Sequence, residues 1–162
     1  MSIDKSKQKR LQENLSSIRK IAGWTADDLG GLLGVTKQNI SNIENLNTNL
    51  SKAQYIAIRH LIDHRAKQKN NYILIRIVRL LIDESDFEDR DYNAIKDAAK
   101  NIGIAAVTMK GNALEIFADT LLSACYTRTS DFTEIEGELK TAIKSKRTYD
   151  WTADLYSDDK EK

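Results

Sequence analysis

Hydrophobic residues recur every three or four positions along most of this chain, which is the spacing that places them on one face of an α-helix. The first such stripe spans residues 11–21. Two shorter stripes occupy residues 26–33 and 36–44, and a longer one spans residues 51–69. The pattern therefore predicts three short helices followed by a long one.

Residues that favour helix ends lie between these stripes. Thr25, Thr36 and Ser51 each precede a stripe, where a hydroxyl can accept a hydrogen bond from the first turn of a helix. Gly34 suits the left-handed conformation that ends a helix. A polar loop over residues 45–50 is expected to separate the third helix from the fourth.

Residues 72–82 are dense in apolar side chains. We interpret this stretch as a mostly buried helix, although its β-branched residues keep a β-strand open as the alternative. The later helices are expected near residues 91–102, 105–127 and 131–147, joined at Gly103 and around Ser130. The chain from Thr148 onward is expected to be frayed.

The composition agrees with a helical protein. The 162 residues include no proline, and the hydrophobic fraction of 41% and the charged fraction of 30% are typical of a globular chain. We therefore predict an all-α fold. The single cysteine, Cys125, allows no internal disulfide and is interpreted as a small buried side chain. No apolar run could cross a bilayer and no secretory signal is present, so we expect a cytoplasmic location without membrane contact.

Charge divides the chain into two unlike halves. Residues 1–82 hold 14 Lys and Arg against 6 Asp and Glu, whereas residues 83–162 hold 11 against 18. A basic half joined to an acidic half suggests that only the first half meets a polyanion.

The segment IRKIAGWTADDLGGLLGVTKQNISNIEN contains three short elements in a fixed order. They are an AG-x-T entry at residues 22–25, an LGVT turn at residues 33–36 and an I-S-x-I-E ending at residues 40–44. With its flanks, from Leu11 to about Asp63, this segment resembles the Cro/cI-type, lambda-repressor-like helix-turn-helix regulators of the xenobiotic-response-element family. The resemblance implies an N-terminal helix-turn-helix bundle, here followed by a C-terminal helical domain, and a transcriptional regulator that binds double-stranded DNA.

The third helix of this segment is the expected reader of DNA. Its apolar residues Ile40 and Ile43 define the inward side, so Gln38 and Asn42 point outward. Amide side chains can bond adenine bidentately, and lysine can reach guanine or phosphate, so we expect base contacts from Lys37, Gln38 and Asn42.

Contacts to the DNA backbone, or secondary contacts, are expected from Arg19, Thr25, Thr36, Asn39, Ser41, Asn45 and Asn47. For Arg19 and Asn45 this role is what the resemblance implies. The alternative is that the polar residues simply cover a solvated helix face.

Two departures from the family pattern affect this interface. Ala26 stands where the family usually has a glutamine that contacts phosphate, and the loop over residues 45–50 lacks the usual glycine and proline. A basic N-terminal cluster could compensate as a flexible arm around the duplex, or could be only a solubilising tail. The cluster consists of Lys5, Lys7, Lys9 and Arg10.

We divide the chain into a basic arm (1–10), a helix-turn-helix DNA-binding domain (11–69), a helical dimerisation or effector domain (70–148) and a flexible acidic tail (149–162). One helix-turn-helix reads only a few base pairs, so a homodimer on a palindromic operator is expected. The apolar segment at 72–82 and the helices after residue 91 are the candidates for the dimer interface. Their alternative role is the core of a single chain.

Other chemistries have less support. His60 and His64 have a spacing that can hold a metal, but two ligands leave a site half built, so no metal and no cofactor are expected. No nucleophile with a base and no catalytic carboxylate pair occur at usable spacing, so we expect no enzyme. The main alternative function is an antitoxin-like inhibitor that binds a partner protein through its C-terminal half and autoregulates its operon. A sensor of a small ligand or peptide is a third hypothesis.

Overall fold

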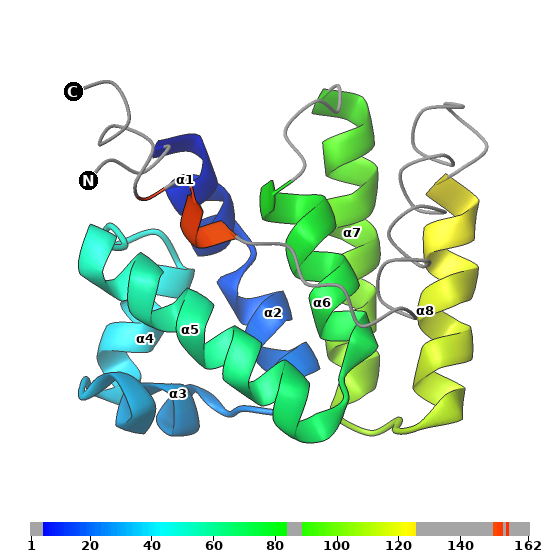
Figure 1. Ribbon diagram of the computed structural model, residues 1–162, viewed down its shortest axis with the longest axis horizontal. Coiled ribbons are helices and arrows are strands. Elements are labelled where there is room, and N and C mark those ends of the chain that lie inside the picture. Colours follow the sequence, from blue (N-terminus) through cyan, green and yellow to red (C-terminus); the bar gives the residue numbers. More distant parts are fainter. Residues whose placement is uncertain (1–4, 84–88, 126–150, 154, 156–162) are drawn as a thin grey trace.

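The structure is a computed structural model that describes residues 5–83, 89–125, 151–153 and 155. Within these ranges the chain is helical and contains no strand, which confirms the predicted all-α fold (Figure 1). The elements are α1 (Lys5–Glu13), α2 (Leu15–Ala22), α3 (Ala26–Leu33), α4 (Lys37–Glu44), α5 (Lys52–Lys69), α6 (Tyr72–Val78), the π-helical turn η1 (Arg79–Asp83), α7 (Asp89–Ala106) and α8 (Asn112–Cys125).

The predicted boundaries of α3, α4 and α5 are confirmed by their caps. The side chains of Thr25, Thr36 and Ser51 each accept a hydrogen bond from a backbone N–H in the first turn of the following helix. Gly34 ends α3 with φ 73°, in the left-handed region where a side chain is disfavoured. These local signals place the turn between α3 and α4 where the sequence predicts it.

The start of the chain differs from the prediction. Residues 5–10 form the first turns of α1, so the flexible arm, one of the two roles considered for the basic cluster at Lys5, Lys7, Lys9 and Arg10, is wrong for them; residues 1–4 lie outside the described part. The expected first helix is interrupted at Asn14, whose φ is −110° and whose side-chain Nδ2 donates to the Arg10 carbonyl, 2.8 Å away. A polar side chain that competes for a helix carbonyl weakens the regular pattern at this point.

Asn14, at this break, also connects the first half of the chain to the second half through a hydrogen bond. Nδ2 of Asn14 lies 2.9 Å from the hydroxyl of Tyr92 on α7, and this hydroxyl donates to the Glu13 carboxylate at 3.0 Å. The guanidinium of Arg10 lies 4.8 Å from the centre of the Tyr92 ring. Burial, together with the bond to Glu13, raises the pKa of Tyr92 to about 12.

The centre of the core is the segment from α6 into η1. Leu74, Ile77, Leu80, Leu81 and Ile82 are fully buried. The helical interpretation of residues 72–82 is therefore confirmed over the strand. These side chains pack within one chain, which supports the alternative role of core for most of residues 72–82, while Tyr72 is 41% exposed.

The helix α7 is continuous through Gly103, where a connection between two helices was predicted. Gly103 lies against α2: a Cβ atom at this position would be 3.1 Å from the carbonyl oxygen of Ser17. The glycine therefore serves a close approach of two helices rather than a turn. The break comes later, before Gly111, whose φ is 64°, so the predicted helices at 91–102 and 105–127 are wrong in their boundaries.

The C-terminal region contains a second difference. The prediction of a flexible tail over residues 149–162 is wrong for Trp151 and Leu155, which are buried at 3% and 4% exposure. The expected helix at residues 131–147 lies outside the described residues. No helix in the described part of the chain has the length and apolar character needed to cross a membrane.

Candidate nucleic-acid interface

The α3–α4 unit is closed by a tight backbone contact. The N–H of Val35 donates to the carbonyl of Gly30 at 2.9 Å. A Cβ atom on Gly30 would come within 2.7 Å of the Val35 carbonyl oxygen, which is closer than any real contact of this kind. Gly30 therefore fixes how closely α4 follows α3, a role that the sequence did not reveal.

The inner side of α4 is held by apolar packing and by one ion pair. Ile40 and Ile43 are fully buried, as predicted from their spacing. Glu44, at the end of α4, accepts from Nε of Arg19 on α2 at 2.6 Å, and both side chains are 11% exposed. Arg19 also donates to the carbonyl of Trp24 at 3.0 Å. The guanidinium that was expected at the DNA backbone is thus a brace between α2 and α4.

The residues predicted to read bases lie together on the outer side of α4. Lys37 and Gln38 are exposed and Asn42 is half-buried. Nε2 of Gln38 donates to Oδ1 of Asn42 at 3.2 Å, so the two amides form a pair. The pairing leaves Oε1 of Gln38 as an acceptor and Nδ2 of Asn42 as a donor for a third group.

The other predicted contact residues divide by exposure. Thr25 and Thr36 are exposed, but their hydroxyl oxygens already cap helices. Ser41 is half-buried, and Asn45 and Asn47 are exposed beyond the end of α4. Asn39 is half-buried, and its Oδ1 atom is buried without a hydrogen-bond partner.

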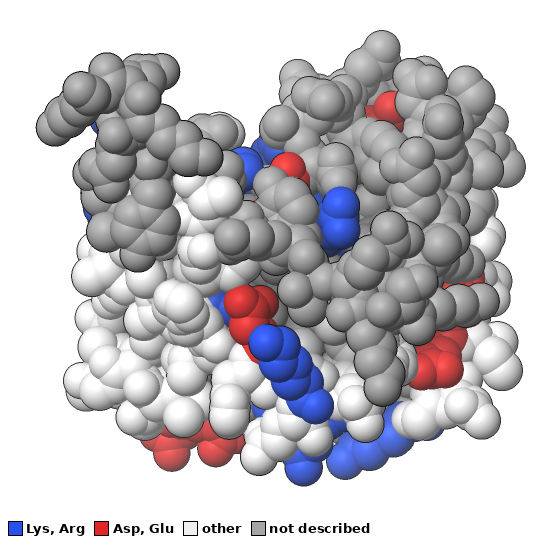
Figure 2. All heavy atoms as spheres, in the orientation of Figure 1, with Lys and Arg blue, Asp and Glu red and all other residues white. Residues whose placement is uncertain are grey.

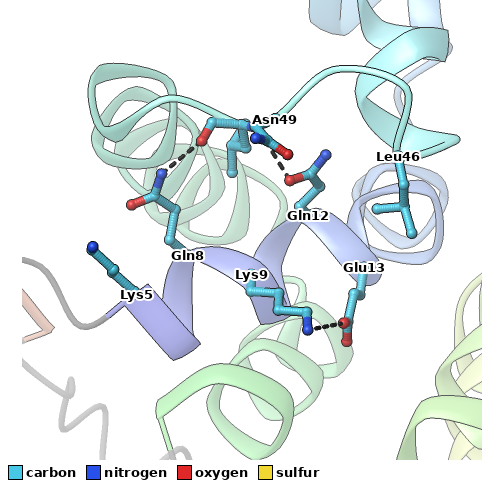
Figure 3. A pocket seen from close by; sticks show the side chains of 8 residues that line it. Lys5, Gln8, Lys9, Gln12, Glu13, Leu46 and Asn49 are labelled. Carbon is cyan, nitrogen blue, oxygen red and sulfur yellow. Dashed lines mark hydrogen bonds and ion pairs between the residues drawn. The ribbon is translucent and has the colours of Figure 1, made fainter.

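Two glutamines of α1 hold the loop after α4 through hydrogen bonds, and the sequence did not predict these contacts. Gln12 donates from Nε2 to the carbonyls of Ile43 (3.0 Å) and Thr48 (2.7 Å), and its Oε1 accepts from the N–H of Leu50 (3.1 Å). Gln8, one turn earlier, donates to the Leu50 carbonyl at 2.6 Å (Figure 3). The only sequence signal was a polar residue beside the apolar stripe of this helix, which is too common to interpret.

A shallow groove of about 450 Å³ lies between α1 and this loop (Figure 3). Lys5, Lys9, Asn49 and Leu46 line it, with the Gln8 and Gln12 side chains on its wall. Leu46 has φ 64° and is 60% exposed. It takes the left-handed conformation that a glycine adopts more readily, and this conformation costs a leucine about 1 kcal/mol.

The α3–α4 unit itself is not basic. Residues 25–50 hold a single cation, Lys37, against Asp27, Asp28 and Glu44. Acidic atoms lie at the lower left of Figure 2, over α3. Hydrogen bonds from the backbone and the hydroxyl of Thr25 lower the pKa of Asp28, so this carboxylate stays charged.

Much of the basic charge of the first half is used inside the fold. Arg59 pairs with Asp83, Arg76 pairs with Asp119, and Arg65 donates to the carbonyl of Ala22. The exposed lysines of this half are Lys5, Lys9, Lys37, Lys52, Lys67 and Lys69. The charge excess that predicted a polyanion partner is therefore distributed over α1, α4 and α5.

The pair of histidines weighed as metal ligands lies on α5. The ring of His60 packs against Trp151, with ring centres 5.0 Å apart. Among the described residues, no three His, Cys, Asp or Glu side chains come together as metal ligands.

Comparison with family models, with curated proteins and with solved structures gives no match for this chain. The assignment of function therefore depends on the chemistry of the residues described above. The strongest feature is a braced helix that presents adjacent amide and ammonium groups.

Proposed function

We propose that this protein is a sequence-specific DNA-binding regulator of transcription, acting as a repressor, and that α3 and α4 form a helix-turn-helix. The observation that carries the proposal is the two-sided character of α4. Its inner side is fixed by Ile40, Ile43 and the Arg19–Glu44 ion pair, while its outer side presents Lys37 and the paired amides. A rigid helix with outward donors and acceptors is what readout in the major groove requires.

The charge distribution favours a reader that depends on base contacts. With one lysine against three acidic residues in the α3–α4 unit, phosphate attraction must come from the lysines of α1 and from Lys52 at the start of α5. Few phosphate contacts give weak non-specific binding and a shallow dependence on salt. The proposed discrimination therefore rests on Lys37, Gln38 and Asn42.

A homodimer is part of the proposal, because one such unit reads too few base pairs for a useful specificity. Since most side chains of residues 72–82 are buried in the core of the chain, the contact is proposed to use other side chains of the second half. Ile104 on α7, Val107 beyond it and Ile116 on α8 are 55%, 64% and 66% exposed. These aliphatic side chains are the proposed interface.

The same three side chains favour one second candidate. Aliphatic residues that are more than half exposed also suit a contact with a different protein. An antitoxin-like inhibitor would use this surface to bind its partner and the α3–α4 unit to regulate its own operon. A stoichiometric partner that copurifies with the chain would support this candidate over a homodimer.

The test is binding to fluorescent duplexes from the region upstream of the gene, compared with scrambled duplexes, by anisotropy at several salt concentrations. Specific binding should exceed non-specific binding by at least ~10³-fold. Gln38→Ala and Asn42→Ala should abolish this preference and leave only the weak non-specific binding. Gln68→Ala, which removes an exposed amide on α5, is the matched control and should change nothing. A wild-type protein with no preference on any upstream fragment contradicts the proposal.

A further inference from the structure

The side chain of Trp151 lies against one face of α5, although 88 residues separate it from its hydrogen-bond partner on that helix. Its indole N–H donates to Oδ2 of Asp63 at 2.7 Å. Its ring meets the rings of Tyr55 and His60 edge to face, with centres 6.2 Å and 5.0 Å apart. With 3% exposure, the indole is enclosed by a set of side chains that match both its ring and its N–H group.

The buried cation Arg59 completes this set. Its guanidinium lies 4.7 Å from the centre of the Trp151 ring and makes two bonds to Asp83, at 2.8 and 2.9 Å. Burial works against the charge, but the hydrogen bonds and the charge of Asp83 outweigh it and raise the pKa of Arg59. The ring of the indole therefore meets a permanent cation, which attracts the face of an aromatic ring.

The receiving side chains are held in place without their occupant. The ion pair of Arg59 with Asp83 and the 3.3 Å bond from Arg59 to the Tyr55 hydroxyl join α5 to itself and to η1. These contacts remain if the indole leaves, and water can replace the indole N–H at the half-buried Asp63. A site that is largely formed before its ligand arrives is typical of small-molecule binding.

Trp151 fills this space without satisfying every polar atom in it. Nε of Arg59 is buried and has no hydrogen-bond partner among the described residues. A buried donor without a partner weakens the closed arrangement, because water reaches that donor when the site opens. The closed arrangement is therefore opposed by one unmade hydrogen bond.

We propose that this face of α5 is a binding site for an indole ring and that Trp151 is its tethered, exchangeable occupant. The indole site consists of Tyr55, Arg59, His60 and Asp63. Its ligand is a free indole or the tryptophan side chain of a peptide. The inference goes beyond the proposed function, and it gives the hypothesis of a sensor for a small ligand or peptide a candidate site.

The first test is displacement of Trp151 in the full-length wild-type protein. The chain contains two tryptophans, Trp24 and Trp151, so 5-fluorotryptophan labelling gives two ¹⁹F signals that Trp151→Phe assigns. A tethered occupant competes at an effective concentration on the order of millimolar, so indole at roughly that concentration should move the Trp151 signal to the position of an exposed indole. The Trp24 signal should remain.

The same titration with N-acetyl-tryptophanamide distinguishes the two sources of the ligand. Displacement at a lower concentration than indole requires supports a peptide, because the added groups then contribute to binding. Displacement by indole alone supports a free small molecule. A Trp151 signal that stays in place at saturating concentrations of both compounds overturns the proposal.

The second test asks whether Asp63 recognises the indole N–H. Trp151→Ala opens the site and should bind indole about tenfold more tightly than wild type, if about one wild-type molecule in ten is open. In this background, Asp63→Ala should weaken binding of indole by about tenfold and leave unchanged that of 1-methylindole, which has no N–H to donate. His64→Ala, at an exposed position of the same helix, is the matched control and should bind both compounds as its parent does.

The wild-type titration keeps the inference testable if Trp151→Ala does not fold. Equal binding of indole and 1-methylindole to the opened site, or no binding of indole to it, overturns the proposal. The proposed function is judged separately, by preference for upstream over unrelated duplex, and neither result decides the other.

Discussion

The two adjacent glycines of α3 allow the geometry of the α3–α4 unit to be tested with one methyl group. A Cβ atom on Gly31 would have no neighbour within 4 Å, whereas one on Gly30 would lie 2.7 Å from the Val35 carbonyl oxygen and 3.3 Å from the Thr36 carbonyl carbon. Alanine at Gly31 should therefore stabilise the protein by about 0.5–1 kcal/mol, since glycine costs that much in a helix.

Alanine at Gly30 gains the same helical preference but forces the backbone of α4 away from α3. The strain of such overpacking is about 1–3 kcal/mol, so the net change should be a loss of about 1–2 kcal/mol. For a chain of this size, Gly31→Ala should raise Tm by about 2 °C and Gly30→Ala should lower it by about 4 °C.

The assay is thermal and urea denaturation of both variants beside wild type, followed by circular dichroism. The essential result is that the two substitutions change the free energy of unfolding in opposite directions. Helix propensity alone would make both variants more stable than wild type. If Gly30→Ala is as stable as Gly31→Ala, the close approach of α4 to α3 does not exist and the reasoning on the α3–α4 unit is refuted.

Three further changes test the supports around α4. Glu44→Gln should cost about 1.5–3 kcal/mol in urea denaturation, because Arg19 loses a charged partner at a site that is 11% exposed; an unchanged midpoint would contradict the brace. Gln12→Ala should cost about 2 kcal/mol and raise hydrogen exchange in the loop after α4, whereas unaltered exchange would show that this amide does not hold the loop. The raised pKa of Tyr92 predicts stability that is complete below pH 10 and is lost as pH rises toward 12, while Tyr92→Phe should flatten this part of the profile.

The sequence predicts the first half of the fold well, because its boundaries are set by short-range chemistry. Thr25, Thr36 and Ser51 cap helices through bonds to residues three positions later, and Gly34 needs only its own backbone angle. Such signals are visible in a window of a few residues.

The predictions that were wrong concern residues whose structure depends on contacts with residues far away in the sequence. Gly103 was taken for a joint, but its reason is the backbone of Ser17 on α2. Trp151 was placed in a frayed tail, yet its partners are on α5. The break at Asn14 depends in part on Tyr92. No local pattern reveals contacts of this kind, and a glycine or an isolated tryptophan has the same appearance with or without them.

The sequence identifies which side chains of α4 point outward. It does not reveal the contacts of Arg19 and Gln12 that hold α4 and the loop after it in place. The period of α4 indicates which side of the helix faces away from the core, so Lys37 and Gln38 could be selected from the sequence. Arg19 was assigned to DNA because the resemblance implies that role, and its ion pair with Glu44, 25 residues away, has no local sequence signal. Gln12 was missed because a buried amide is distinguished only by the three backbone groups that it satisfies.

The most direct test of the central claim is selection of bound duplexes from a random pool by the full-length protein, with sequencing of what is retained. The account predicts a palindromic consensus whose half-sites are about one helical turn apart, and loss of adenine or guanine preference within the half-site for Gln38→Ala and Asn42→Ala. A retained pool with no consensus, or a consensus identical in wild type and both variants, would contradict the proposal that α4 reads DNA.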